Sequence, residues 1–296
     1  MRNRWTFFDG FIYAALLILS LTTLYPFIYV IAYSLNDGMD SMRGGIYMWP
    51  RKFTLENYIT VLQDVKILRA YWITISRTVV GTVLHVFLNA LFAYALTKHS
   101  VPGRKFFILL IFLPVLFNAG FIPNFILYRE LGLINTFWVY IIPSLYSFFH
   151  ILILRTFFDQ LPEGLIESAR IDGCNEFGIY FRIILPLSGP VMATISLFVG
   201  VGHWNDWFTG TFYVNDENLI PVQTLLQQLL TQSQALAEAA SGSNSSASAQ
   251  FADTLTTTPE SLRMSTLVIA VLPIMCVYPF LQRYFVKGAM LGSIKG

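Results

Sequence analysis

The chain alternates long apolar stretches with polar connections. Six apolar segments can be drawn, at residues 11–34, 71–96, 106–128, 137–156, 186–207 and 265–286. Each has about 20 residues or slightly more, which is the length that crosses the hydrocarbon core of a bilayer as a helix. The pattern predicts an all-α, polytopic membrane protein with six transmembrane helices, folded as a single transmembrane domain over residues 1–296.

The first apolar segment follows a basic N-terminus and at first sight resembles a signal peptide. It is too long for the apolar core of such a signal, and no small-residue cleavage pattern follows it. We therefore expect this segment to stay in the protein as a membrane anchor.

The loops between the segments set the expected orientation. An even number of spans places both termini on one side, and the distribution of Lys and Arg indicates that this side is the cytoplasm. The loop at 35–70 is then extracytoplasmic, although it carries five cations, and so is the longest loop, at 208–264. The loop at 157–185 is cytoplasmic. These assignments predict a multi-pass protein of the cell membrane.

Composition narrows the class of partner. Hydrophobic residues make up 55% of the chain and aromatic residues 16%, which is more apolar surface than a soluble domain buries, so membrane lipid is the expected surrounding. A net charge of +2 gives no reason to expect nucleic acid. Cys174 and Cys276 are far apart and have no neighbouring His or Cys at ligand spacing. We expect neither a disulfide nor a metal site.

The window from Asp159 to Pro186 is the most polar part of this apolar chain, with five acidic and two basic residues. Pro162 suits the first turn of a helix, and Gly173 suits a left-handed residue that ends one. The helix between them has about ten residues and a length of roughly 16 Å, too short to cross a bilayer. It carries an apolar stripe beside an acidic face, so it can dock sideways into a groove on a partner.

The spacing within this window carries a family resemblance. Glu167-Ser168-Ala169 is followed after three residues by Gly173, and nine residues later by Ile183-Ile184-Leu185-Pro186. This resembles the cytoplasmic EAA loop of ABC importer permeases, with Ser168 as the one departure. The resemblance implies a type I importer permease fold with a short coupling helix. It also implies that Glu163, Glu167, Ser168, Ala169, Asp172 and Gly173 couple the chain to ATPase subunits. An ordinary amphipathic linker helix is the alternative.

Polar side chains inside the apolar segments are candidates to line a path for a polar solute: His85, Asn89, Asn118 and Asn124. His85 and Asn89 are four residues apart and therefore share a helix face. An Asn in hydrocarbon needs a partner or water. Hydrogen bonds that only hold the helices together are an equally good explanation for each of the four.

The fifth segment ends in Gly202-His203-Trp204-Asn205-Asp206-Trp207-Phe208. Tryptophans at this depth are typical of an interfacial belt. Polar groups between aromatic faces are also typical of sites that bind sugars. The W-N-[DE]-[FW] pattern resembles the carbohydrate-specific branch of the same permeases, which adds Trp204, Asn205 and Asp206 to the candidate pathway.

The loop at 208–264 has a middle rich in Ser, Ala and Thr that cannot build a core of its own. In the maltose-type importers, the smaller permease sends the matching loop into the sugar cleft of an external binding protein. The resemblance implies the same contact here, and we assign it to Ser243, Asn244, Gln250 and Phe251. A disordered spacer is the alternative.

The sequence lacks the common motifs of nucleotide-binding and catalytic sites. It contains no G-x-x-x-x-G-K-[ST], no H-E-x-x-H and no G-x-S-x-G, so we expect neither an enzyme nor a cofactor held by this chain. The rival class is a secondary transporter or channel for a polar solute, which couples to ions through buried carboxylates or broken-helix ion sites. Here Asp206, near the outer surface, is the one acidic residue inside a predicted span.

The resemblance therefore implies a permease subunit of an ATP-driven oligosaccharide importer in a bacterial cell membrane. Its partners would be a second, non-identical permease, two ATP-binding subunits that hold ATP and Mg, an extracytoplasmic solute-binding protein and the sugar itself.

Overall fold

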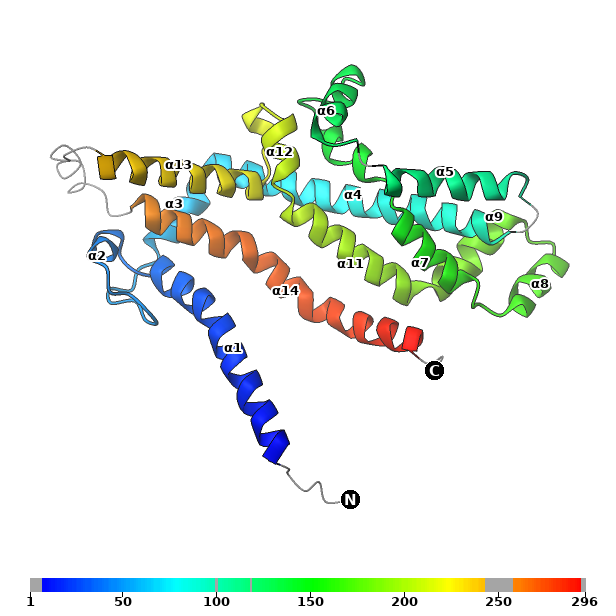
Figure 1. The fold of residues 1–296 in the computed structure, drawn as a ribbon, viewed down its shortest axis with the longest axis horizontal. Coiled ribbons are helices and arrows are strands. Elements are labelled where there is room, and N and C mark those ends of the chain that lie inside the picture. The colour runs from blue at the N-terminus through cyan, green and yellow to red at the C-terminus, as the bar shows by residue number, and fades with distance from the viewer. Residues whose placement is uncertain (1–6, 99–100, 118, 243–257, 294–296) are drawn as a thin grey trace. The chain divides into compact units, whose positions relative to one another are not determined.

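The structure is a computed structural model that describes residues 7–98, 101–117, 119–242 and 258–293 (Figure 1). Helices make up most of these residues, and the described part contains no strand beyond an isolated bridge between Asn36 and Phe53. The predicted all-α class is confirmed. The elements are α1 (Phe7–Ser34), α2 (Gly38–Met42), α3 (Glu56–Gln63), α4 (Val65–Thr97), α5 (Arg104–Leu116), α6 (Phe121–Glu130), η1 (Phe137–Tyr140), η2 (Ile142–Ser144), α7 (Phe148–Phe158), α8 (Glu163–Ile171), α9 (Glu176–Ile179), η3 (Tyr180–Ile184), α10 (Leu185–Leu187), α11 (Gly189–Asn205), α12 (Phe208–Tyr213), η4 (Glu217–Leu219), α13 (Val222–Gly242) and α14 (Pro259–Ser293).

Contacts group the chain into two compact units. One holds the residues up to Leu68 together with Leu225–Leu272, and the other holds Arg69–Thr224 together with the residues from Pro273 onward.

The first unit contains α1 and the short helices that follow it. α1 continues through Pro26, and its apolar side chains are exposed along most of its length. At its end, the Asn36 side-chain amide donates to Asp40 Oδ2 and to Ser41 Oγ, while the amide oxygen of Asn36 accepts from the Lys52 backbone N–H. Arg51 pairs with Asp40 across 3.0 Å. These bonds give a polar loop a fixed structure without a large apolar core.

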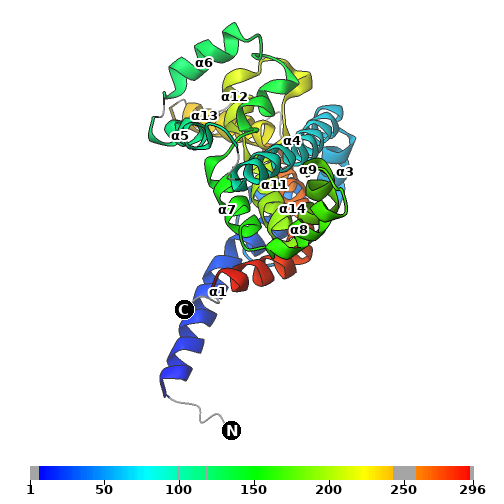
Figure 2. The same ribbon diagram turned by 90° about the vertical axis from the view of Figure 1, so that its right-hand side faces the viewer.

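The second unit is built on α4, which lies beside α7 and α11. Ala90 of α4, Leu154 of α7 and Ile195 of α11 are fully buried in one core cluster. Gly81 lets α4 approach α11 closely, because a Cβ at Gly81 would lie 2.4 Å from Nε2 of His203. α8 and α9 lie at the C-terminal end of α4, and Figure 2 looks at the molecule from that end.

The predicted spans differ in how continuous they are. Within the residues that the structure describes, three helices are long and apolar enough to cross a membrane: Phe8–Ser34, Val65–Thr97 and Pro259–Cys276. Two bent pairs bring the number to five: Phe137–Ser144 with Phe148–Phe158, and Glu176–Leu187 with Gly189–Asn205. The segment predicted at 106–128 is divided into α5 and α6, and Gly120 adopts a left-handed φ of 82° directly before α6. The number of six spans stays a prediction.

Candidate coupling surface and polar centre

Helix α8 has the bounds that its flanking residues predict. Pro162 precedes its first residue, and Glu163 places a carboxylate in the first turn, where the helix dipole favours negative charge. Gly173 takes a φ of 81°, and the N–H of Cys174 bonds back to the carbonyl of Ala169 at 2.9 Å. This left-handed residue ends the helix as glycine commonly does. The short polar helix is therefore confirmed, at nine residues.

The faces of α8 are clearly divided. Ile166 and Ala169, three residues apart, pack together with Leu161 against the core cluster of α4, α7 and α11. Glu163, Glu167 and Ile171 are spaced at i, i+4 and i+8, so they share a different face, and all three are exposed. Ile171 is 86% exposed. We name this face, made of Glu163, Glu167 and Ile171, the coupling face.

The other residues of the predicted coupling set support the helix. The Ser168 hydroxyl donates to the carbonyl of Gly164 at 2.6 Å, so it stays within α8. Asp172 is the exposed C-terminal cap residue, and its N–H donates to the carbonyl of Ser168.

One carboxylate ties α8 to the end of α4. Glu176 of α9 accepts from Arg170 of α8 at 2.7 Å, from the hydroxyl of Tyr94 at 2.6 Å and from Lys98 at 3.1 Å. Its hydrogen bond and charge raise the pKa of Arg170, which therefore stays a cation. Sequence reasoning did not single out Glu176. The available signal was an acidic residue three positions after Gly173.

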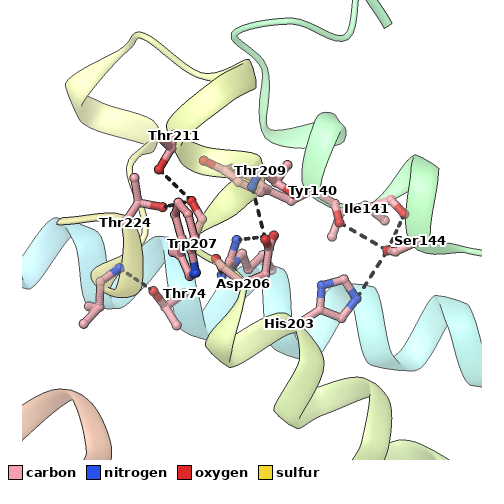
Figure 3. Close-up of polar contacts among 12 residues, drawn as sticks. Thr74, Tyr140, Ile141, Ser144, His203, Asp206, Trp207, Thr209, Thr211 and Thr224 are labelled. Carbon is pink, nitrogen blue, oxygen red and sulfur yellow. Dashed lines mark hydrogen bonds and ion pairs between the residues drawn. The ribbon is translucent and has the colours of Figure 1, made fainter. Parts of the chain in front are cut away.

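A polar centre lies where α4 meets the broken segment from η1 to α7. Nδ1 of His85 is 2.5 Å from the carbonyl oxygen of Ser144, and Nε2 of His85 is 2.8 Å from Nδ1 of His150. A carbonyl only accepts, so with neutral rings His85 carries its hydrogen on Nδ1 and accepts from His150. His203 of α11 reaches the Ser144 hydroxyl at 3.4 Å (Figure 3). Three of the four histidines of the chain thus meet around Ser144.

Asn89 lies one turn below His85 and binds the same segment. Its amide nitrogen donates to the carbonyls of His85 and Leu145, at 2.6 and 2.8 Å, and its oxygen accepts from the N–H of Ser147 at 3.0 Å. These bonds show how the two residues brace a helix break, in which freed backbone groups need new partners. Their role in a solute pathway stays a prediction.

Asp206, at the end of α11, is paired with a buried arginine. Oδ2 of Asp206 is 3.3 Å from a guanidinium nitrogen of Arg77, which is fully buried and lies 4.9 Å from the ring centre of Tyr140. The other oxygen accepts from the N–H of Thr209 at 3.1 Å and so begins α12 (Figure 3). Arg77 lies within α4, 129 positions before Asp206, and the sequence analysis did not foresee this pair.

The remaining candidates are dispersed. Trp204 is buried with its ring edge-on to Tyr71, and Asn205 is exposed. Asn124 is half-buried in α6. Asn118, Ser243, Asn244, Gln250 and Phe251 lie outside the described residues.

These features define a class: a polytopic helical membrane protein whose exposed amphipathic helix is held against a bundle with broken spans. Comparison with known proteins gives the family. Residues 90–290 match the family described as "Binding-protein-dependent transport system inner membrane component", and the chain belongs to it. It is therefore a permease subunit of an ABC transporter and not an enzyme, and a bacterial membrane protein.

Relatives of known name cover the whole length. The "Polygalacturonan/rhamnogalacturonan transport system permease protein YtcP" of Bacillus subtilis is 38% identical over all of both chains. "Protein LplC" of the same organism is 39% identical over 93% of this chain and 90% of its own. A chain from the crystal structure of "a bacterial ABC transporter involved in the import of the acidic polysaccharide alginate" has 30% identity and a TM-score of 0.84, covering 96% of this chain and 99% of its own.

Proposed function

We propose that this chain is one permease subunit of an ATP-driven importer of oligosaccharides, and that acidic sugars are its substrates. It forms half of the translocation pathway, and separate ATPase subunits drive it through α8. The observation that carries the proposal is the coupling face: two carboxylates and an apolar side chain exposed on a short helix whose opposite face is buried in the chain's own core.

The shape of α8 suits the transmission of work. A helix of nine residues is roughly 14 Å long, so it cannot span a bilayer but can lie in a groove as a rigid rod. Ile171 supplies an apolar anchor, and Glu163 and Glu167 supply charges that a basic groove would pair. A partner that covers the exposed Ile171 side chain removes apolar surface from water, which lowers the free energy of the complex.

The substrate class rests on the relatives. The name of YtcP gives polygalacturonan and rhamnogalacturonan, and the related crystal structure is of an importer of alginate, an acidic polysaccharide. AraQ of Halalkalibacterium halodurans, 29% identical over 99% of this chain, is named for arabinooligosaccharides. Because the relatives more than 35% identical include one named for a galacturonan, we favour uronate-containing oligosaccharides over neutral ones.

The partners follow from the same mechanism. They are a second, non-identical permease, two subunits that bind ATP and Mg, and an external solute-binding protein. In support of the last, a structure that shares this fold at a TM-score of 0.58 and 14% identity is described as a "complex with alginate pentasaccharide-bound periplasmic protein". The termini and the loop at 157–185 face the cytoplasm, while the loops at 35–70 and 208–264 face outward, where Ser243, Asn244, Gln250 and Phe251 meet the binding protein.

The pathway residues remain part of the proposal. We assign to it His85, Asn89, Asn118, Asn124, Trp204, Asn205 and Asp206. Of these, Asn205 is exposed, and it is the first choice for a substitution that changes uptake without changing stability.

The proposal is tested by reversing one charge of the coupling face. In the importer reconstituted with its partners in liposomes, Glu167→Lys should lower uptake and binding-protein-stimulated ATPase by at least about tenfold, because like charges that meet across an interface cost several kcal/mol. Glu130→Lys reverses an exposed carboxylate of α6 and should leave both rates unchanged. Full activity of Glu167→Lys would refute the coupling role, and uptake that needs no ATP would refute the class of importer.

A further inference from the structure

Glu176 stands between two helices that the proposed mechanism must connect. It belongs to α9, yet its carboxylate bonds Arg170 of α8 on one side and Tyr94 and Lys98 at the end of α4 on the other. The two oxygens divide this task. Oε1 accepts from Arg170, and Oε2 accepts from the Tyr94 hydroxyl and from Lys98. A single side chain thus holds both helices.

The group on the α4 side is itself well fixed. Nζ of Lys98 lies 4.4 Å from the ring centre of Tyr94 as well as 3.1 Å from Glu176, so the cation is held by a carboxylate and an aromatic face together. The ring of Tyr94 is buried and lies 5.3 Å from that of Tyr180, which is fully buried in the core cluster. The Tyr94 hydroxyl therefore has little freedom to follow a displaced carboxylate.

Apolar contact alone would hold α8 less specifically. Ile166 and Ala169 pack against the core, but hydrophobic contact has no preferred direction, so a short helix can slide or rotate on it at low cost. Charge-assisted hydrogen bonds are shorter and have a preferred geometry. The Glu176 bonds therefore add directional contacts between α8 and the end of α4 to the apolar packing.

We propose that Glu176 is the positioning residue that makes α8 and the C-terminal end of α4 move as one body. When a partner displaces α8, the displacement then reaches α4 instead of being lost as sliding. α4 has 33 residues and a length of about 50 Å, and it carries Arg77, Gly81, His85 and Asn89. The inference rests on the proposed coupling role of α8, and it adds the residue through which that coupling enters the bundle.

The first test is Glu176→Gln in the reconstituted importer, with uptake and ATPase measured on the same preparation. The amide keeps the size and one acceptor of the carboxylate but loses its charge. We expect the complex to assemble and to hydrolyse ATP, while uptake per ATP falls roughly fivefold, at the lower end of coupling between two sites. Asp159→Asn is the matched control, because it neutralises a carboxylate of the same loop that pairs with Arg155 four residues away. The control should keep the wild-type ratio.

A second set of variants separates coupling from local bracing. Tyr94→Phe with Lys98→Met removes the α4 side of the network and leaves the bond between Arg170 and Glu176 intact. If Glu176 connects the helices, this variant loses uptake per ATP as Glu176→Gln does, and adding Glu176→Gln costs little more. If Glu176 only braces the turn from α8 to α9, Arg170→Gln reproduces the defect and the α4 variant does not. That result would overturn the inference.

The two proposals fail in different ways. If α8 is not the coupling helix, Glu167→Lys remains active, whatever Glu176→Gln does. If α8 couples but Glu176 is not its link to α4, Glu167→Lys is inactive and Glu176→Gln keeps the wild-type ratio of uptake to ATP hydrolysis.

Discussion

The buried pair of Arg77 and Asp206 gives the sharpest prediction of stability. Arg77 is fully buried, and 29% of the Asp206 side chain is accessible. Besides Asp206, the guanidinium meets the backbone carbonyl of that residue and the ring of Tyr140, and its Nε has no partner within the described residues. The Asp206 carboxylate is thus the one full counter-charge among these contacts.

Asp206→Asn removes this charge and keeps a side-chain oxygen that can accept from the N–H of Thr209 at the start of α12. Breaking a buried ion pair on one side costs about 3–5 kcal/mol, because the remaining charge is left in a poorly hydrated site. Asp206 is partly exposed, and Arg77 keeps its other contacts. We therefore expect the free energy of unfolding to fall by an amount near the lower end of this range, roughly 3 kcal/mol. Replacing both residues, as Arg77→Met with Asp206→Asn, should recover most of this loss, because no buried charge remains.

The assay is unfolding of the purified chain in detergent micelles, followed by tryptophan fluorescence. Asp159→Asn is again the control, since its partner Arg155 is partly exposed and such pairs contribute at most about 1 kcal/mol. The reasoning is wrong if Asp206→Asn is as stable as wild type, or if the double variant is no more stable than the single one.

Two further predictions concern close packing and pH. Gly81→Ala should destabilise the chain by about 1–3 kcal/mol in the same assay, because its Cβ would lie 2.4 Å from the His203 ring, whereas Gly202→Ala meets nothing within 4 Å and should not destabilise. Asp40 should make unfolding pH-dependent: its hydrogen bond from Asn36, with a smaller effect of Arg51, lowers its pKa. The stabilisation is then complete above the ordinary pKa of about 4 and is lost as the pH falls through the lowered value. Asp40→Asn should remove that part of the pH dependence, and an unchanged profile would contradict the assignment.

Local signals predicted the local parts of this protein well. Pro162 and Gly173 bound a short polar helix, and both act as expected because proline and glycine restrict or free the backbone regardless of distant contacts. Long apolar runs likewise gave α1, α4 and α14. In these cases the residues that determine the element lie within it or next to it.

Long-range pairing was beyond the sequence. Arg77 and Asp206 are 129 positions apart, and His85 and His150 are 65 apart. Periodicity shows which face of a helix a residue occupies, but not which helix that face will meet. The hydropathy pattern also did not predict that 106–128 is divided into two helices, because hydropathy carries no information on the backbone conformation of Gly120. Only the folded chain shows that Asp206 neutralises a cation and that Glu176 joins two helices.

The corner before α11 has a mechanical consequence. Glu176–Leu187 and Gly189–Asn205 meet at 78° around Ser188. The two arms of this corner are both attached to α4: Glu176 at one end bonds Tyr94 and Lys98, and Asp206 after the other end pairs with Arg77. The arms hold 12 and 17 residues, so their lengths are roughly 18 and 25 Å. The corner is therefore braced against one helix at both of its ends, and a displacement of either end also acts on α4.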